Sequence, residues 1–492
     1  MMRRWGVLFA VVASLALGAC AKAPLAVAPA PERSVIEANL MRDISVLASN
    51  EFAGRKPGTV GEDLTVAHII EQMEQAGLQS GTNDPGSAWL APVDLVSTKA
   101  LESHITLRTN RGEVEVAQSS GAAFAGSRRA LIDGVDVMFV GRKSDSVVPE
   151  TITGKIVVML GEPGVSPQRR AKLFEANPAA IITVVEDDDA IANVRRAYGR
   201  ERLVLASEAT DRLTAFITTQ VMESAFPDGA WSALVTAAGA DEFEPQMLEA
   251  TIAIDARTSR REFASSNVIG LLPGAVPGSG AVLLLSHWDH LGECGSEEAD
   301  DLICNGAIDN ASGIAVMLEL SRRLAAHGPL DRDIYFLATS AEESGLLGAR
   351  AFADAPPMPL DSIVAAFNFD TVAVAPAGSP VGFVGEGRTP LDPLILQVME
   401  ESGRTLGNRE FAESFVRRQD GWALLDKGVP AVFLSTAFGS EIVLGPYLEA
   451  DYHRPSDEID RIELGGAIDD LLLHEELVRR VASTTAYPLS EQ

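Results

Sequence analysis

Short apolar runs alternate with helix-like segments over the second half of the chain. The runs AVLLLS, IYFLATS, SIVAAFNFD and AVFLST are long enough for buried strands and too short for ordinary helices. The segments ASGIAVMLELSRRLAAHG and AIDDLLLHEELVRRVASTTA carry apolar residues three or four positions apart, as a helix with one buried face does. Continuous apolar strands that alternate with helices predict an α/β fold with a mainly parallel sheet.

The same domain begins near the amino terminus with two further helices. Apolar positions recur with helical period from residue 34 to Leu47, and again from Leu64 to Ala76. Glycine and proline interrupt the period in the stretch EFAGRKPGT, which predicts a loop. We assign residues 34–100 to this first part of the α/β domain.

Residues 101–251 have a different pattern. The short runs ITLRTN, VDVMFVG, GKIVVMLG and AAIITVV are typical of strands, and RRAKLFEAN between two of them is typical of a helix. No cluster that combines histidines with carboxylates follows these runs. The sequence therefore predicts a separate β-rich domain without a reactive site, after which residues 252–492 resume the α/β pattern.

The first residues resemble a secretion signal. MMRR is a short basic segment, and WGVLFAVVASLALGA is apolar but too short to span a bilayer comfortably. Leu17-Gly18-Ala19-Cys20 resembles a bacterial lipobox, which implies a signal peptide over 1–20 and lipidation of Cys20. Residues 21–33 are rich in alanine and proline, as an extended tether is. An uncleaved anchor helix is the alternative.

The residue after the lipobox cysteine is alanine, not the aspartate associated with retention in the inner membrane. We therefore expect a lipoprotein of the bacterial envelope, anchored in the outer membrane and facing the periplasm or the exterior. No later segment is apolar for long enough to span a bilayer.

Length and charge narrow the possible functions. A chain of 492 residues is too long for one ordinary core, so two domains are expected. The 69 acidic residues outnumber the 40 lysines and arginines and give a net charge of −29. This balance excludes nucleic acid as a partner, because no excess of positive charge is present to neutralise phosphates. It favours cations, including metal ions and protonated amines.

Two further cysteines, Cys294 and Cys304, lie in one loop after the first α/β strand. The envelope outside the cytoplasm permits disulfides, so we expect a bond that closes this loop. Metal ligation by the pair is less favoured, because enough carboxylates lie nearby.

Histidines and carboxylates follow the predicted strands. His287 ends AVLLLSH, Glu342 and Glu343 follow IYFLATSA, and Asp370 ends SIVAAFNFD. Asp309 precedes a predicted helix, and His453 lies in the loop ADYHRPSD. Because the carboxyl ends of parallel strands share one edge of the sheet, these distant positions can converge. Nitrogen and carboxylate ligands without thiolate suit zinc, and their number suits two ions with a shared carboxylate.

The motifs SHWDHLG, NGAIDNASG, TSAEESGLLG, FNFD and DYHRPSD resemble those of the M28 zinc metallopeptidases, the family of aminopeptidases Y and S. LASNEFAGRKPGT resembles the segment with which many bacterial members begin. GKIVVMLGEPG with its neighbours resembles a protease-associated domain, which is inserted in several peptidase families. The resemblance implies a phosphorylase/hydrolase-like zinc exopeptidase fold, with helices flanking a mixed, mainly parallel sheet, and the insertion over 101–251.

The resemblance also implies roles for single residues. His287 and Asp370 would hold one zinc ion, Glu343 and His453 a second, and Asp309 would bridge the two. Three more residues would act beside the metals: Glu342 as general base, Asp289 as a carboxylate that orients the ligands, and Tyr452 as a hydrogen-bond donor to the reacting carbonyl oxygen. A packed surface aromatic is the alternative for Tyr452, and we expect His290 to be structural.

An aminopeptidase that cleaves peptides is the function this resemblance implies first. A carboxypeptidase of the same fold stays open, because Arg417-Arg418 could clamp a terminal carboxylate. A non-catalytic receptor is a second class, and a cyclase of glutaminyl type with a single zinc is a third. Two segments depart from the family pattern, Thr371-Val372-Ala373 and the long loop with the cysteines. The sequence therefore does not determine the shape of the pocket walls. Oligomeric state is also open.

Overall fold

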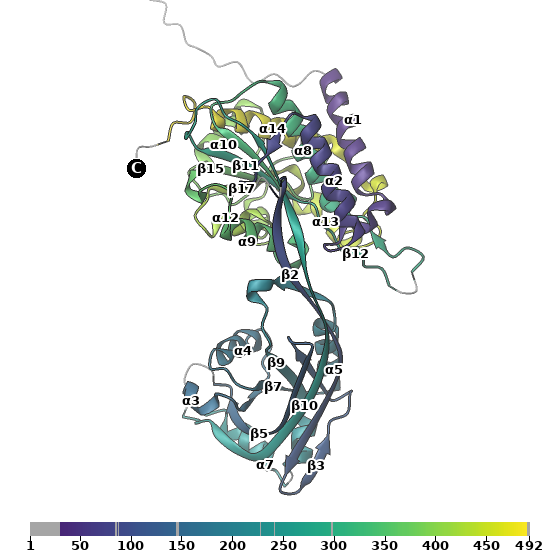
Figure 1. The fold of residues 1–492 in the computed structure, drawn as a ribbon, viewed down its shortest axis with the longest axis vertical. Coiled ribbons are helices and arrows are strands. Elements are labelled where there is room, and N and C mark those ends of the chain that lie inside the picture. Colours follow the sequence, from purple (N-terminus) through teal and green to yellow (C-terminus); the bar gives the residue numbers. More distant parts are fainter. Residues whose placement is uncertain are drawn as a thin grey trace, which may run out of the picture.

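The computed structural model describes residues 30–83, 86, 88–143, 147–226, 228–240, 242–296 and 299–489. Figure 1 shows two bodies joined by a narrow neck. Two long strands form the neck and continue into both bodies: β2 (Leu90–Thr109) and β10 (Gln246–Leu272), which pair antiparallel from Leu90↔Val268 to Thr109↔Ala250. The signal, Cys20 and the tether as far as residue 29 lie outside the described residues. No helix within the described part is long and apolar enough to cross a membrane.

The larger body contains the sheet that the four apolar runs predict. These runs are β11 (Ala281–His287), β14 (Asp333–Thr339), β15 (Ile363–Asn368) and β17 (Ala431–Ser435), and they pair in parallel in the order β17-β15-β11-β14. Antiparallel strands close both sides, with β16 (Gly382–Val384) beside β17 and β10 beside β14. The mixed, mainly parallel sheet predicted from the sequence is confirmed.

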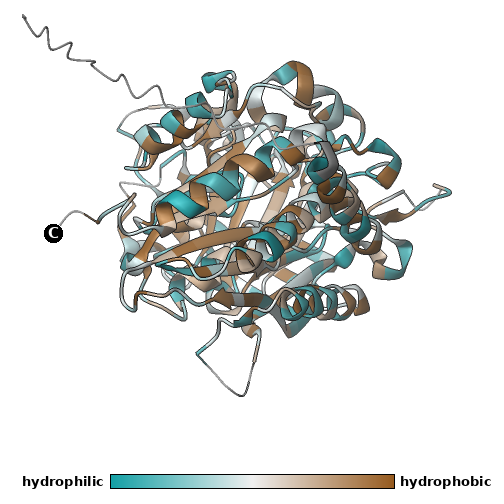
Figure 2. Cartoon of the chain, turned by 90° about the horizontal axis from the view of Figure 1, so that it is seen from above, coloured by the Kyte–Doolittle hydropathy of each residue, from teal (hydrophilic) through white to brown (hydrophobic). Residues whose placement is uncertain are grey.

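Helices cover both faces of this sheet, and Figure 2 shows their apolar sides turned toward the apolar strands. Alternate residues of β11 pack into different cores, Leu284 with one set of helices and Leu283 and Leu285 with the other. The first set is α1 (Ala30–Leu47), α2 (Val60–Gln75), α8 (Ser312–Ala326), α10 (Asp392–Glu401), α13 (Glu441–Ala450) and α14 (Leu464–Ala482); the second is α9 (Leu347–Asp354) and α12 (Gly421–Leu425).

The smaller body has its own core, and its strands continue the same hydrogen-bonded sheet through β10. Its parallel strands are β5 (Arg129–Gly141), β6 (Ile156–Leu160), β7 (Ala180–Val185) and β9 (Leu213–Thr218), with antiparallel β4 (Gly121–Ala125) at the edge. The other elements are β3 (Gly112–Glu115), β8 (Arg202–Leu205), α3 (Pro149–Ile152), α4 (Ser166–Phe174), α5 (Asp188–Tyr198), α6 (Thr219–Ala225) and α7 (Ala230–Ala237). The expected limits of the insertion, 101 and 251, fall inside β2 and β10.

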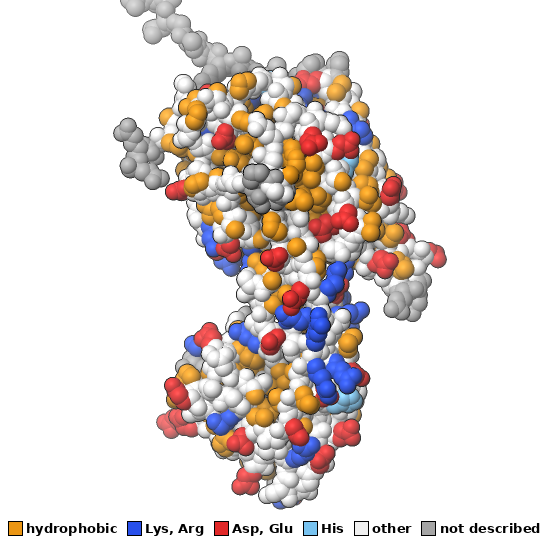
Figure 3. All heavy atoms as spheres, viewed as in Figure 1, with side chains coloured by type: hydrophobic (Ala, Val, Ile, Leu, Met, Phe, Trp, Pro, Cys, Tyr) orange, Lys and Arg blue, Asp and Glu red, His pale blue; other side chains and the backbone are white. Residues whose placement is uncertain are grey.

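Basic and acidic side chains join the two bodies at the neck. Lys56 Nζ of the larger body lies 2.6 Å from Glu201 Oε2 of the smaller one, and Arg350 pairs with Glu208. Arg261 in β10 donates to the carbonyl of Gly58 at 3.1 Å. Figure 3 shows blue side chains gathered over this region, where Arg128, Arg260 and Arg261 line one surface hollow.

A buried histidine in α14 makes the stability of the larger body depend on pH. His474 packs edge-on against Phe367 and Phe369, and its Nδ1 lies 2.7 Å from the carbonyl oxygen of Asp470. Burial lowers the pKa of His474 to about 4 from its ordinary 6.5. Between these two values the unfolded chain binds a proton that the folded chain refuses, so stability falls as the pH falls through this window.

We predict that His474→Leu removes this contribution, because leucine does not titrate. Between about pH 7 and about pH 5 the parent protein should lose about 2 kcal/mol of stability relative to the variant. Denaturant unfolding of both proteins at the two pH values measures the difference. His104→Leu, at an exposed position, is the matched control and should follow the parent. Equal pH dependence of the parent and His474→Leu would contradict the assignment.

Candidate metal centre

Five side chains that the sequence singled out converge at the carboxyl edge of the larger sheet. His287 is the last residue of β11, Glu343 follows β14 in a short turn, and Asp370 lies two residues after β15. Asp309 lies in the turn before α8, and His453 in the loop after α13. The parallel register of the three strands puts their ends at one edge, which is why residues so far apart in sequence can meet there.

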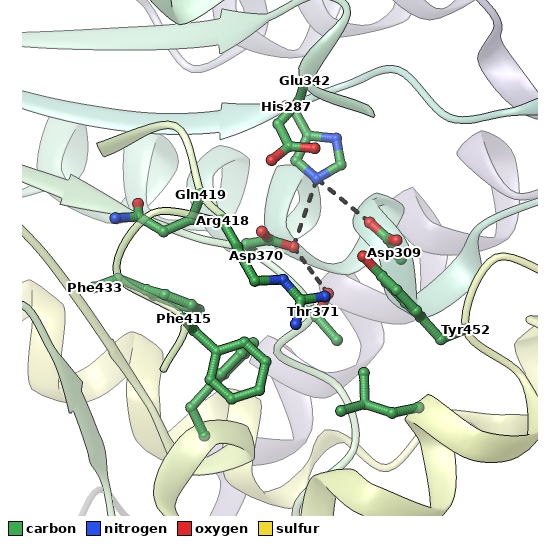
Figure 4. A pocket seen from close by; sticks show the side chains of 12 residues that line it. His287, Asp309, Glu342, Asp370, Thr371, Phe415, Arg418, Gln419, Phe433 and Tyr452 are labelled. Carbon is green, nitrogen blue, oxygen red and sulfur yellow. Dashed lines mark hydrogen bonds and ion pairs between the residues drawn. The ribbon is translucent and has the colours of Figure 1, made fainter. Parts of the chain in front are cut away.

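The first group surrounds the imidazole of His287. Its Nε2 lies 3.3 Å from Asp309 Oδ1 and 3.5 Å from Asp370 Oδ1, as the dashed lines of Figure 4 show. All three residues are buried. On its other side, Nδ1 lies 3.1 Å from the carbonyl oxygen of Asp289, which fixes the orientation of the ring.

The second group lies on the other oxygen of the same aspartate. His453 Nε2 is 3.3 Å from Asp309 Oδ2 and 2.8 Å from Glu343 Oε2. Although these distances are short, His453 Nε2 is buried and its geometry satisfies no hydrogen bond. Asp309 therefore presents Oδ1 to His287 and Oδ2 to His453, as a carboxylate shared by two metal ions would.

The donor atoms fit zinc. Two ligands of one tetrahedral zinc ion, each about 2.0–2.1 Å from it, are separated by about 3.3 Å. Three of the four nitrogen–oxygen distances above are 3.3–3.5 Å. The buried Nε2 of His453 without a hydrogen bond, and carboxylates held together away from water, are explained by cations between them.

His290, which the sequence predicts to be structural, lies directly beside the second group of side chains. Its Nδ1 lies 2.7 Å from Glu343 Oε1 and 3.9 Å from Asp309 Oδ2, so His290, Asp309 and Glu343 form a second group able to hold a metal. Glu343 thus directs Oε1 to His290 and Oε2 to His453. The signal was its place three residues after His287, in the loop that leaves the same strand.

Glu342 and Asp289 lie beside the metal ligands. Glu342 lines the pocket with His287, Asp309 and Asp370. Its backbone N–H donates to Asp289 Oδ1 at 3.0 Å, so Asp289 holds both this turn and, through its carbonyl, His287. Burial raises the pKa of Glu342 well above its usual range, and raises the pKa of Asp289 to about 7.

Two groups behind the site hold the backbone that carries its ligands. Arg55, fully buried, donates to the carbonyls of Trp288, Asn305 and Gly306 at 2.9, 2.5 and 2.9 Å. Burial lowers its pKa to about 10. Asp457 accepts from the backbone N–H of Ile308 and Asp309 at 2.9 and 3.0 Å, and burial raises the pKa of Asp457 to about 6.

Tyr452 and the cysteine loop border the site. The ring of Tyr452 stacks on that of His453 with 3.8 Å between centroids, and Tyr452 lines the pocket. Burial raises the pKa of its hydroxyl, which keeps the group a hydrogen-bond donor.

Cys294 is bonded to Cys304 and closes the loop whose strands are β12 (Gly292–Glu293) and β13 (Ile303–Cys304). Cys20, the expected lipidation site, lies outside the described residues.

A pocket opens in front of the site, with His287, Asp309, Glu342 and Asp370 on one side of it. Thr371, one of the positions that depart from the family pattern, forms part of its wall and donates from Oγ1 to Asp370 Oδ1 at 2.8 Å. The remaining wall residues, on the side away from the metal ligands, are Phe415, Arg418, Gln419, Phe433, Phe438 and Leu448.

Comparisons with known proteins agree with this geometry. Residues 267–471 match the model of peptidase family M28. The chain is 38% identical over 99 residues to the alkaline phosphatase isozyme conversion protein of Escherichia coli (strain K12), covering 19% of this chain and 28% of that protein. It is 36% identical over 110 residues to aminopeptidase YwaD of Bacillus subtilis (strain 168), covering 22% and 21%. These matches span less than a third of either relative's length.

A longer but weaker likeness extends over most of the chain. It is 23% identical over 451 residues to the probable lipoprotein aminopeptidase LpqL of Mycobacterium tuberculosis (strain ATCC 25618 / H37Rv), covering 85% of this chain and 84% of that one. An aminopeptidase from Aneurinibacillus sp. strain AM-1 has the same fold, with a TM-score of 0.56, 19% identity, and coverage of 92% and 95%. The segment that matches the model of peptidase family M28, residues 267–471, carries all five converging side chains.

Proposed function

We propose that this chain is a zinc exopeptidase that removes the amino-terminal residue of peptides with two metal ions. The observation that carries the proposal is the position of Asp309, which faces one histidine with each of its carboxylate oxygens. YwaD, which matches part of the chain, and LpqL, which matches most of it, are both named aminopeptidases. These names support cleavage at the amino terminus.

Five residues would hold the ions. His287 and Asp370 would bind one, Glu343 and His453 the other, and Asp309 would bridge them. Bound zinc lowers the pKa of water and polarises the carbonyl of the scissile bond. Cobalt and manganese are chemical substitutes, since the ligands are nitrogen and oxygen.

The protein's own groups would move the protons. Glu342, in the pocket beside the ligands, would accept a proton from the attacking water and return it to the leaving amine. Asp289 holds the backbone of Glu342 at 3.0 Å and so keeps the carboxylate in reach. The Tyr452 hydroxyl, which burial keeps protonated, would donate a hydrogen bond to the oxyanion that develops on the substrate.

The charge of the site favours a free amino terminus. Glu342 and Asp370 line the pocket, and a protonated α-amine would be attracted to carboxylates that the metals do not fully neutralise. A carboxypeptidase is the second candidate, because Arg418 lines the same pocket and carries a charge that suits a terminal carboxylate.

We propose that the protein acts in the bacterial envelope, where a lipid on Cys20 would anchor it to the outer membrane. The lipobox-like sequence supports this location, as does the description of LpqL as a lipoprotein. The partners would be peptide substrates and the membrane reached through the lipid, with no nucleic acid.

We predict that the purified protein hydrolyses leucine p-nitroanilide. Activity should fall to background after treatment with a chelator and return when zinc is added, because the proposed reaction requires bound metal ions to activate water. Amino-terminally blocked peptides test the polarity. If the protein cleaves amino-terminally blocked peptides but no substrate with a free amino terminus, the aminopeptidase proposal is contradicted and a carboxypeptidase is favoured.

We also predict that Glu342→Gln lowers kcat by about 100-fold or more, because the amide cannot accept the proton of water. Zinc content, measured by elemental analysis, should stay at the parent value, since Glu343 and not Glu342 reaches the histidines. Glu441→Gln, at an exposed position at the start of α13, is the control and should retain full activity. Parent-like turnover in Glu342→Gln would remove Glu342 from the mechanism.

A further inference from the structure

An arginine lies among the substrate-facing residues of the pocket. Arg418 comes from the segment between α11 (Arg409–Glu413) and α12, and it lines the same pocket as His287, Glu342 and Asp370. Figure 4 shows its side chain reaching from the Gln419 side into the space before the metal ligands. A positive charge here is not required by the metal centre, whose ligands are carboxylates and imidazoles.

No carboxylate neutralises this guanidinium within the described part of the chain. Its one recorded side-chain contact is with the ring of Phe415, whose centroid lies 5.2 Å from the guanidinium carbon. Other arginines form ion pairs with a nearby carboxylate. Arg323, for example, lies 2.7 Å from Glu475. Arg418 is therefore supported by an aromatic ring and keeps its N–H donors available to a ligand.

The rest of the pocket limits what the ligand is. Phe415, Phe433, Phe438 and Leu448 make an apolar wall beside Arg418. An arginine donates two parallel N–H hydrogen bonds to the two oxygens of a carboxylate. A neutral amide or an alkyl chain on the substrate cannot accept this pair of bonds.

We propose that Arg418 is a specificity residue that binds a carboxylate carried by the substrate beside the scissile bond. This inference rests on the proposed peptidase function. The carboxylate has two possible sources: the side chain of an amino-terminal glutamate or aspartate, or the free carboxyl terminus of a dipeptide. Both present the same group to the same donors.

The chain offers a matched control at the next position. Arg417 is exposed like Arg418, but its guanidinium carbon lies over the ring of Trp422, 4.9 Å from the centroid, and it does not line the pocket. Arg417→Gln and Arg418→Gln remove the same charge from adjacent residues. Any general effect of net charge on substrate attraction should therefore appear in both variants, and a specific contact in only one.

The experiment compares two pairs of substrates that differ only by a carboxylate. Glutamate and glutamine p-nitroanilides test the side chain, while Leu-Gly and its carboxyl-terminal amide test the terminus. In the zinc-loaded parent, kcat/KM should be at least about tenfold higher for the acid in one pair. Arg418→Gln should bring that ratio to about one, Arg418→Lys should keep part of it, and Arg417→Gln should keep all of it. The pair that responds identifies the source.

The same four compounds, titrated by calorimetry against zinc-loaded Glu342→Gln protein with and without Arg418→Gln, test the contact without turnover. Ratios that are unchanged by Arg418→Gln in both pairs would overturn the inference, even if leucine p-nitroanilide is still cleaved. Failure to cleave any substrate would instead overturn the proposed function. In that case, loss of acid-selective binding in Arg418→Gln would still support the contact, and equal binding would refute it.

Discussion

The site depends on holding several buried carboxylates close together. Donor atoms of Asp309 and Asp370 lie within 4.8 Å of each other, as do those of Asp309 and Glu343. Two negative charges at such a distance repel by about 3–4 kcal/mol at an effective dielectric constant near 20. Histidines alone offset this only when protonated, and protonated rings cannot bind metal. Divalent cations resolve the conflict, because they neutralise the carboxylates and leave the imidazoles free to act as ligands.

A rigid frame is needed to keep such groups in place, and the fold supplies it from behind the site. Arg55, in the turn after α1, binds carbonyls on both sides of the ligand-bearing loops, and Asp457 holds the N–H of Asp309 itself. The first helices thus do more than cover the sheet. They bring a buried cation to the loops that carry His287 and Asp309, which explains why residues before the insertion belong to the larger body.

Much of this arrangement could be predicted from sequence because it follows from local pattern. Apolar runs identified β11, β14, β15 and β17, and the rule that parallel strands share an edge brought the residues after them together. The contact of His290 with Glu343 could not be predicted, because the ring turns toward Glu343 only once the loop has folded. The predicted limits of the insertion, 101 and 251, fall inside β2 and β10, because these single strands run through both bodies. Arg418 could be named, but only the pocket shows that it faces the reacting groups while Arg417 does not.

The most direct test of the account is diffraction from zinc-loaded crystals at wavelengths on both sides of the zinc absorption edge. The difference locates zinc without reference to the protein's assumed chemistry. The account predicts two peaks on opposite sides of Asp309, one within bonding distance of His287 and Asp370, the other within bonding distance of Glu343 and His453. A single peak, or two peaks that do not share Asp309, would contradict it.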